Sequence, residues 1–92
     1  MQFMVTWRLP AASYRAAVAR FLETGAPPPE GLETLGRWHA AGSTKGFHLL
    51  EGTEAALMQH IAEWADLMDI EAFPVVDDQT AGAIAARLVQ KT

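Results

Sequence analysis

Hydrophobic and polar positions change their spacing along the chain, and these changes divide it into elements. Residues 2 to 8 are rich in β-branched and aromatic side chains and end before Pro10, which predicts a strand. From residue 12 to 24 the apolar positions recur at helical spacing, and Gly25 supplies the left-handed residue that commonly closes a helix. The chain therefore begins with a strand followed by an amphipathic helix.

The middle of the chain predicts a connector and a hairpin. Residues 26 to 31 contain three consecutive prolines, which cannot continue a helix because each lacks the N–H and disfavours helical geometry in the residue before it. Residues 32 to 39 and 46 to 51 are two short, largely apolar runs and predict two strands around a turn.

The turn of this hairpin sets which side chains share a face. A type II′ turn prefers glycine at its first central position, so Gly42-Ser43 predicts a two-residue loop. This loop places Arg37 opposite His48. It also places His39 opposite Gly46, so that the three polar side chains share one face of the sheet. A loop one residue longer would move every side chain of one strand to the other face.

The last part of the chain predicts a helix, a strand and another helix. Residues 54 to 68 carry an apolar stripe, with Thr53 as the N-cap. Residues 70 to 76 predict a fourth strand, and Pro74 directs it to a sheet edge, where a missing N–H is tolerated. Asp77-Asp78 then cap a third amphipathic helix.

The order βαββαβα predicts one α+β domain over residues 1–92. Its most economical form is a four-stranded antiparallel sheet with two helices on one face, the ferredoxin-like arrangement, and an extra C-terminal helix. To the helix-covered face we assign Phe3, Val5, Trp7, Trp38, Phe47, Leu49, Ile70 and Ala72. The open face then receives Met4, Thr6, Leu35, Arg37, His39, His48, Leu50, Glu71, Phe73 and Val75. Because such a face is too apolar for water, we expect a homodimer through the open sheet face.

Composition narrows the classes of function. The 92 residues include 11 acidic and 7 basic side chains, with a net charge of −4, and the scattered bases form no positive stripe for a nucleic acid. No basic leader opens the chain, and no apolar run approaches the roughly 20 residues that span a bilayer. We therefore expect a soluble, cytoplasmic protein with no nucleic-acid or membrane partner. The lack of cysteine excludes disulfides and thiolate metal sites.

Several segments resemble the DUF3303 family of small, mainly bacterial proteins. They are the TGAPPPEG run at 24–31, GRWH at 36–39, Gly46-Phe47 with Glu51, EWAD at 63–66 and Pro74-Val75. The resemblance covers nearly the whole chain. It implies a dimeric α/β barrel and supplies no activity. The wider superfamily includes cofactor-free monooxygenases, haem-degrading enzymes and lactone isomerases, which raises the expectation of a small-molecule cavity without assigning a reaction.

His39 and Arg37 are the candidate catalytic residues. Imidazole titrates near neutrality and can act as a general acid or base, and the planar guanidinium can hold an anionic oxygen. Two plainer roles compete with these. His39 could be a strand-end histidine satisfied by backbone or water, and Arg37 could form a salt bridge to Glu71 or to an acid of the other subunit.

The candidate ligand-binding residues are Trp7, Trp38, His48, Glu71 and Phe73. The three aromatic side chains would wall a pocket beside His39. The two tryptophans also lie on predicted buried stripes and would serve equally well as core residues. His48 would serve equally as a half-buried strand residue.

No metal or cofactor is predicted. His39 and His48 with Glu51 or Glu71 would supply suitable ligand atoms, but Glu51 lies on the opposite predicted face and no HxH or HExxH spacing occurs. A lone candidate histidine is a poor basis for haem binding. The chain also lacks a glycine-rich nucleotide loop and a nucleophile elbow.

Two functional hypotheses follow. In the first, each subunit of a homodimeric α/β barrel holds a small organic molecule, as in a cofactor-independent oxygenase or isomerase, with His39 as acid or base and Arg37 holding an anionic oxygen. In the second, the dimer is a non-catalytic ligand-binding, interaction or structural protein. The distinguishing feature is whether His39, Arg37 and Glu71 converge on one water-accessible cavity.

Overall fold

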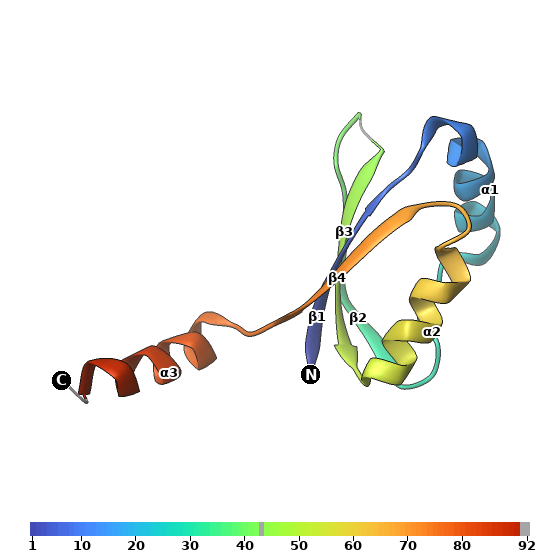
Figure 1. The fold of residues 1–92 in the computed structure, drawn as a ribbon. Coiled ribbons are helices and arrows are strands. Elements are labelled where there is room, and N and C mark those ends of the chain that lie inside the picture. Colours follow the sequence, from blue (N-terminus) through green and yellow to red (C-terminus); the bar gives the residue numbers. More distant parts are fainter. Residues whose placement is uncertain (43, 91–92) are drawn as a thin grey trace.

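A computed structural model describes residues 1–42 and 44–90 of the chain. It has one open antiparallel sheet with α1 and α2 on one face and α3 beyond it (Figure 1). The strands are β1 (Gln2–Arg8), β2 (Leu32–His39), β3 (Lys45–Gly52) and β4 (Asp69–Val75). The helices are the short η1 (Ala11–Ser13), then α1 (Tyr14–Thr24), α2 (Glu54–Trp64) and α3 (Asp78–Gln90). The predicted α+β class and four-stranded antiparallel sheet are confirmed.

Local signals set the ends of the first two α-helices. α1 ends as predicted at Gly25, whose φ of 73° is left-handed and whose N–H donates to the carbonyl of Phe21 at 2.7 Å. α2 begins at the predicted cap, since the Thr53 hydroxyl accepts from the Ala56 N–H at 3.1 Å. It ends at Trp64 instead of the predicted residue 68, because the chain already turns there towards β4.

The sheet order is β2-β3-β1-β4, with every neighbouring pair antiparallel. β4 therefore lies at an edge, as Pro74 predicted. The register of the hairpin is also confirmed, because Arg37 pairs with His48 and His39 pairs with Gly46. The predicted Gly42-Ser43 turn includes Ser43, which lies outside the described residues.

The predicted face of the hairpin was wrong. Across β1 and β3, Val5 pairs with His48 and Phe3 pairs with Leu50, and residues directly opposite each other point to the same side of a sheet. Arg37, His39 and His48 therefore lie on the face that α1 and α2 cover. Trp38, Phe47 and Leu49, which were predicted beneath the helices, belong to the open face.

Two glycines explain this arrangement of the tryptophans. Trp7 pairs with Gly46 on the helix-covered face, and a Cβ atom at position 46 would overlap the Trp7 indole. On the open face, the Trp38 ring lies over Gly36 in the same strand, where a Cβ atom would be equally crowded. Each glycine thus makes room for one indole, and the two indoles are on opposite faces.

The core lies between the sheet and the helices. Its buried members are Phe3, Val5, Leu32, Leu50, Ala56 and Leu57, with Ile61, Ile70 and Ala72 packed against them. The three residues from α2 are at helical spacing, so this helix supplies the main cover of the core. None of the helices in the described part of the chain is both long and apolar enough to span a membrane.

Two apolar surfaces are uncovered in a single chain. The first is the open face of the sheet, where Trp38 is 54% exposed and Phe73 is 47% exposed. The second is α3, which extends away from the sheet at the end of an extended segment, with all of its residues exposed (Figure 1). Its predicted N-cap is present, because the Asp77 side chain accepts from the Thr80 N–H at 2.8 Å.

Candidate small-molecule site

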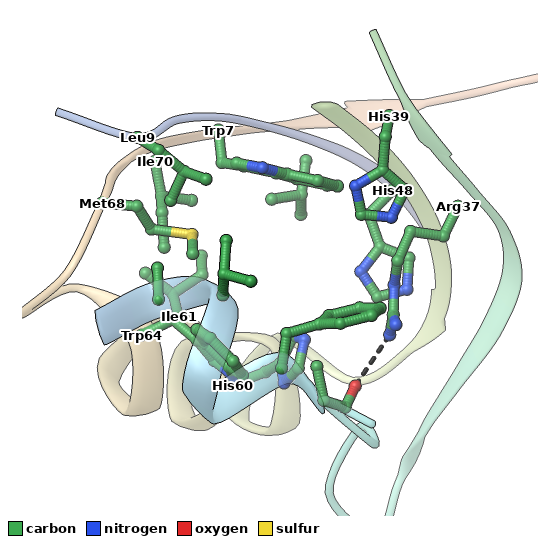
Figure 2. A pocket seen from close by; sticks show the side chains of 15 residues that line it. Trp7, Leu9, Arg37, His39, His48, His60, Ile61, Trp64, Met68 and Ile70 are labelled. Atoms are coloured by element: carbon green, nitrogen blue, oxygen red, sulfur yellow. Dashed lines mark hydrogen bonds between the residues drawn. The ribbon is translucent and has the colours of Figure 1, made fainter. Parts of the chain in front are cut away.

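A cavity of about 280 Å³ lies between the sheet and the first two α-helices (Figure 2). Most of its wall is apolar and comes from β1, α1, α2 and the start of β4. The apolar and aromatic side chains that line it are Val5, Trp7, Leu9, Ala17, Val18, Phe21, Ala26, Ile61, Trp64, Met68 and Ile70. Of the candidate residues, Trp7, Arg37, His39 and His48 line the same cavity.

The polar groups of the cavity gather at one end. Figure 2 shows Arg37, His39 and His48 close together, with Leu9, Met68 and Ile70 on the opposite side. His60, from α2, is the fourth polar residue of the wall. No acidic side chain belongs to the wall as the described residues define it. The cavity is therefore amphipathic, with a basic end and an apolar end.

Arg37 is held at the basic end by the end of α1. One of its terminal nitrogens, Nη2, donates to the Ala26 carbonyl at 2.7 Å (Figure 2). The other, Nη1, donates to the Gly25 carbonyl at 3.3 Å. Its guanidinium carbon also lies 5.7 Å from the centre of the Phe21 ring. Within the described chain no acid forms an ion pair with Arg37, and Glu71 lies on the other face of the sheet.

His48 is deeply buried, with 3% of its surface exposed. The Nε2 atom of its ring lies 2.8 Å from the Thr34 hydroxyl. A bulge at Leu35 interrupts the strand register after Thr34, which pairs with Leu50 on the helix-covered side. Burial lowers the pKa of His48 to about 4, and the charges of Arg37 and His60 act in the same direction. His48 is therefore neutral at pH 7.

His60 is the functional candidate that the sequence analysis missed. Its ring centre is 5.7 Å from that of His48, and only 7% of its surface is exposed. Its Nδ1 atom is buried and has no hydrogen-bond partner among the described residues. Burial lowers its pKa, the Glu63 charge raises it, and the Arg37 charge lowers it again. The available signal was its position three residues after Leu57 and four before Trp64, within the apolar stripe.

His39 marks the mouth of the cavity. It lines the wall but is exposed to solvent, so it lies where the cavity meets the surface. Its ring meets the Trp7 ring edge-on with centres 5.4 Å apart, and the Phe21 ring in the same way at 5.5 Å. The aromatic contacts thus hold the imidazole at the solvent-exposed side of the cavity.

Three of the predicted ligand-binding residues are not at this cavity. Trp38 pairs with Phe47, Glu71 pairs with Thr6 and Phe73 pairs with Met4, all on the open face. The cause is the hairpin face, which was predicted incorrectly relative to β1. The aromatic wall is instead made by Trp7 with Phe21 and Trp64.

The arrangement is suited to holding an organic molecule. One guanidinium and two buried imidazoles can donate or accept hydrogen bonds at one end, and the rings can contact an apolar body at the other. Within residues 1–42 and 44–90, no group of three or more His, Cys, Asp or Glu side chains could hold a metal ion.

Comparison with known families gives one match. Residues 1–89 match the family described as Domain of unknown function (DUF3303). No curated protein sequence matches the chain.

Proposed function

Since the chain belongs to the DUF3303 family, a domain of unknown function, we propose from its site that it binds a small organic molecule in the cavity between the sheet and the helices. The observation that supports this most strongly is the convergence of Arg37, His48 and His60 on one cavity whose remaining wall is mainly apolar. A ligand with a hydrogen-bonding group could bind at these polar side chains while its apolar part contacts the rest of the wall.

The form of the cavity supports the same proposal. Small-molecule sites are usually apolar hollows with a few convergent polar groups, and their volumes begin at about 300 Å³. This cavity, at about 280 Å³, lies just below that range. Its occupant is therefore a compact molecule, with one or two rings, whose polar end faces Arg37.

We also propose that the working form is a homodimer of ferredoxin-like protomers, a dimeric α/β barrel. The strand order β2-β3-β1-β4 and the two helices on one face agree with that arrangement. A second copy placed on the open face would remove Trp38 and Phe73 from water, which a lone protomer cannot do.

The C-terminal helix supports a second copy as the partner. An isolated helix of about 12–15 residues is only marginally stable in water. α3 has 13 residues, and its stripe includes Ile84 and the 69%-exposed Leu88. Because α3 extends away from its own sheet, it would pack against the partner protomer and add to the same interface (Figure 1).

Catalysis at the same cavity is the second candidate, and one observation favours it. His48 lies opposite Arg37, so an imidazole and a cation are adjacent. Isomerases that form an enolate, and the carbanion-forming step of cofactor-independent oxygenases, need such a pair: a base removes a C–H proton and a cation stabilises the oxyanion. In this role His39, at the mouth, would exchange the proton with water.

A substitution that fills the cavity tests the proposed binding. Val18 lines the cavity, so Val18→Trp should occupy the space and weaken binding of cinnamate or cinnamyl alcohol at least tenfold. Leu22, one turn further along α1, is 77% exposed, and Leu22→Trp is the matched control that should leave binding unchanged. Isothermal titration calorimetry measures both. If neither probe binds the unaltered protein, or if both variants bind equally, the proposed function is wrong.

A further inference from the structure

The charge balance of the cavity points to the class of its ligand. Arg37 is half-buried and forms no ion pair with any acid of the described chain. Its two hydrogen bonds go to the neutral carbonyls of Gly25 and Ala26, so its charge is not neutralised. A guanidinium has five N–H donors, and these two hydrogen bonds use two of them. The cavity thus carries a positive charge in mainly apolar surroundings.

An anion is the natural partner for such a group. A positive charge held away from water without a counter-charge is unfavourable, and a hydrogen-bonded anion removes that penalty. The fork of Arg37 matches a carboxylate, which can accept two parallel hydrogen bonds. No acidic side chain among the described lining residues would repel such an anion.

The amount of charge favours a monoanion. Arg37 supplies one positive charge, and the burial of His48 and His60 opposes a second one. A phosphate monoester carries about −1.5 to −2 at neutral pH, so part of its charge would stay uncompensated beside apolar side chains. A carboxylate carries a single negative charge, so Arg37 would leave none of its charge uncompensated.

The rest of the wall indicates the shape of the apolar part of the ligand. Figure 2 shows Trp7 and Trp64 on opposite sides of the cavity, with Ile61 near Trp64. Aromatic side chains on two sides favour a flat ring, which they can contact by stacking or edge-on. The small volume limits this body to one or two rings.

We propose that the cavity binds a small aromatic monocarboxylate, with its carboxylate at Arg37 and its ring between Trp7 and Trp64. This inference rests on the proposed binding function and adds the ligand class to it.

The test compares probes of matched shape and different charge at neutral pH. Cinnamate and cinnamyl alcohol share a skeleton, and phenyl phosphate carries nearly two charges. Calorimetry on the unaltered protein should show cinnamate binding at least tenfold more tightly than either of the others. This comparison needs no variant, so it does not depend on any substitution being tolerated.

A substitution then assigns the preference to one residue. Arg37→Gln should reduce the affinity for cinnamate to that for cinnamyl alcohol. Arg15→Gln, which removes the same charge from an exposed position of α1, should change neither affinity. If Arg37→Gln does not fold, Arg37→Lys keeps the charge and should retain a preference for cinnamate that is smaller than that of the unaltered protein.

The outcomes distinguish an incorrect ligand class from an incorrect binding function. If cinnamyl alcohol binds as tightly as cinnamate, or phenyl phosphate binds more tightly, the site exists but its ligand is not a monocarboxylate. If Arg37→Gln keeps the full preference, Arg37 is not the anion-binding group. If no probe binds, the proposed function itself is wrong.

Discussion

At the scale of single residues, the pair Arg37 and His48 dominates the electrostatics of the cavity. The two lie opposite each other on β2 and β3, on the face beneath the helices. Burial is the main reason why the pKa of His48 is lowered to about 4, and the Arg37 charge adds to it. The strand pairing thus fixes a cation beside an imidazole that stays neutral at pH 7.

This lowered pKa makes stability depend on pH. The ordinary pKa of histidine is about 6.5, so between pH 6.5 and about 4 the unfolded chain binds a proton at position 48 that the folded chain does not. The free energy of unfolding should therefore fall as the pH falls through this window, by about 3 kcal/mol for His48 alone. The lowered pKa of His60 acts in the same direction.

Urea unfolding at a series of pH values measures this effect. His48→Leu should flatten the curve between pH 6.5 and about 4, because the titrating group is removed. Leu22→Ala, at an exposed position of α1, changes no titratable group and is the control that should leave the slope as it was. An equal slope in all three proteins would show that His48 is not the titrating group.

Because Nδ1 of His60 is buried, replacing this residue should raise stability and weaken ligand binding. His60→Leu replaces an unpartnered polar ring by an apolar side chain, so the free protein should gain about 1 kcal/mol in its free energy of unfolding. Its affinity for cinnamate should fall at the same time. Thermal unfolding and calorimetry measure the two effects. A loss of stability instead would mean that Nδ1 already has a partner in the free protein.

At the scale of elements, most bounds of helices and strands could be predicted because their signals are local, and the end of α2 at Trp64 is an exception. Gly25 ends α1, Thr53 and Asp77 cap the next two helices, and Pro74 directs β4 to an edge. The register of the hairpin could be predicted as well, because strands joined by one short turn have few ways to pair. Arg37, His39 and His48 were therefore correctly placed on one face.

The face itself could not be predicted from the same signals. It depends on how β3 pairs with β1, and these strands are separated by α1, the proline connector and β2, so no turn fixes their register. Aromatic residues occur on both faces of the hairpin, which made Trp38 seem a core residue. The pairing of Trp7 with Gly46 was the unused signal, since the Trp7 indole occupies the space that a Cβ atom at position 46 would fill.

At the scale of the whole molecule, the proposed homodimer would cover two apolar surfaces of the single chain. Trp38 and Phe73 are exposed on the open face of the sheet, and Leu88 is exposed on α3. A lone chain therefore leaves two apolar surfaces in water. The homodimer was predicted from the apolar character of the open face and stays a prediction. The extension of α3 away from the sheet could not be predicted, because its stripe resembles that of any helix that covers a core.

Size-exclusion chromatography with light scattering tests the proposed dimer. The unaltered protein should be dimeric at micromolar concentration, and Trp38→Glu should shift it towards monomer, because it buries a charge in the proposed interface. Leu22→Glu, an exposed position on α1 outside both surfaces, should leave the dimer intact. A monomeric unaltered protein would contradict the proposal.

Nuclear magnetic resonance tests ligand binding most directly, because two of the three tryptophans line the cavity and the third lies elsewhere. Trp7 and Trp64 line the cavity, whereas Trp38 lies on the open face. In a titration with cinnamate, the indole N–H signals of Trp7 and Trp64 should shift together and saturate, and that of Trp38 should stay in place. A shift of Trp38 alone, or no shift in any of the three, would contradict a ligand site between the sheet and the helices.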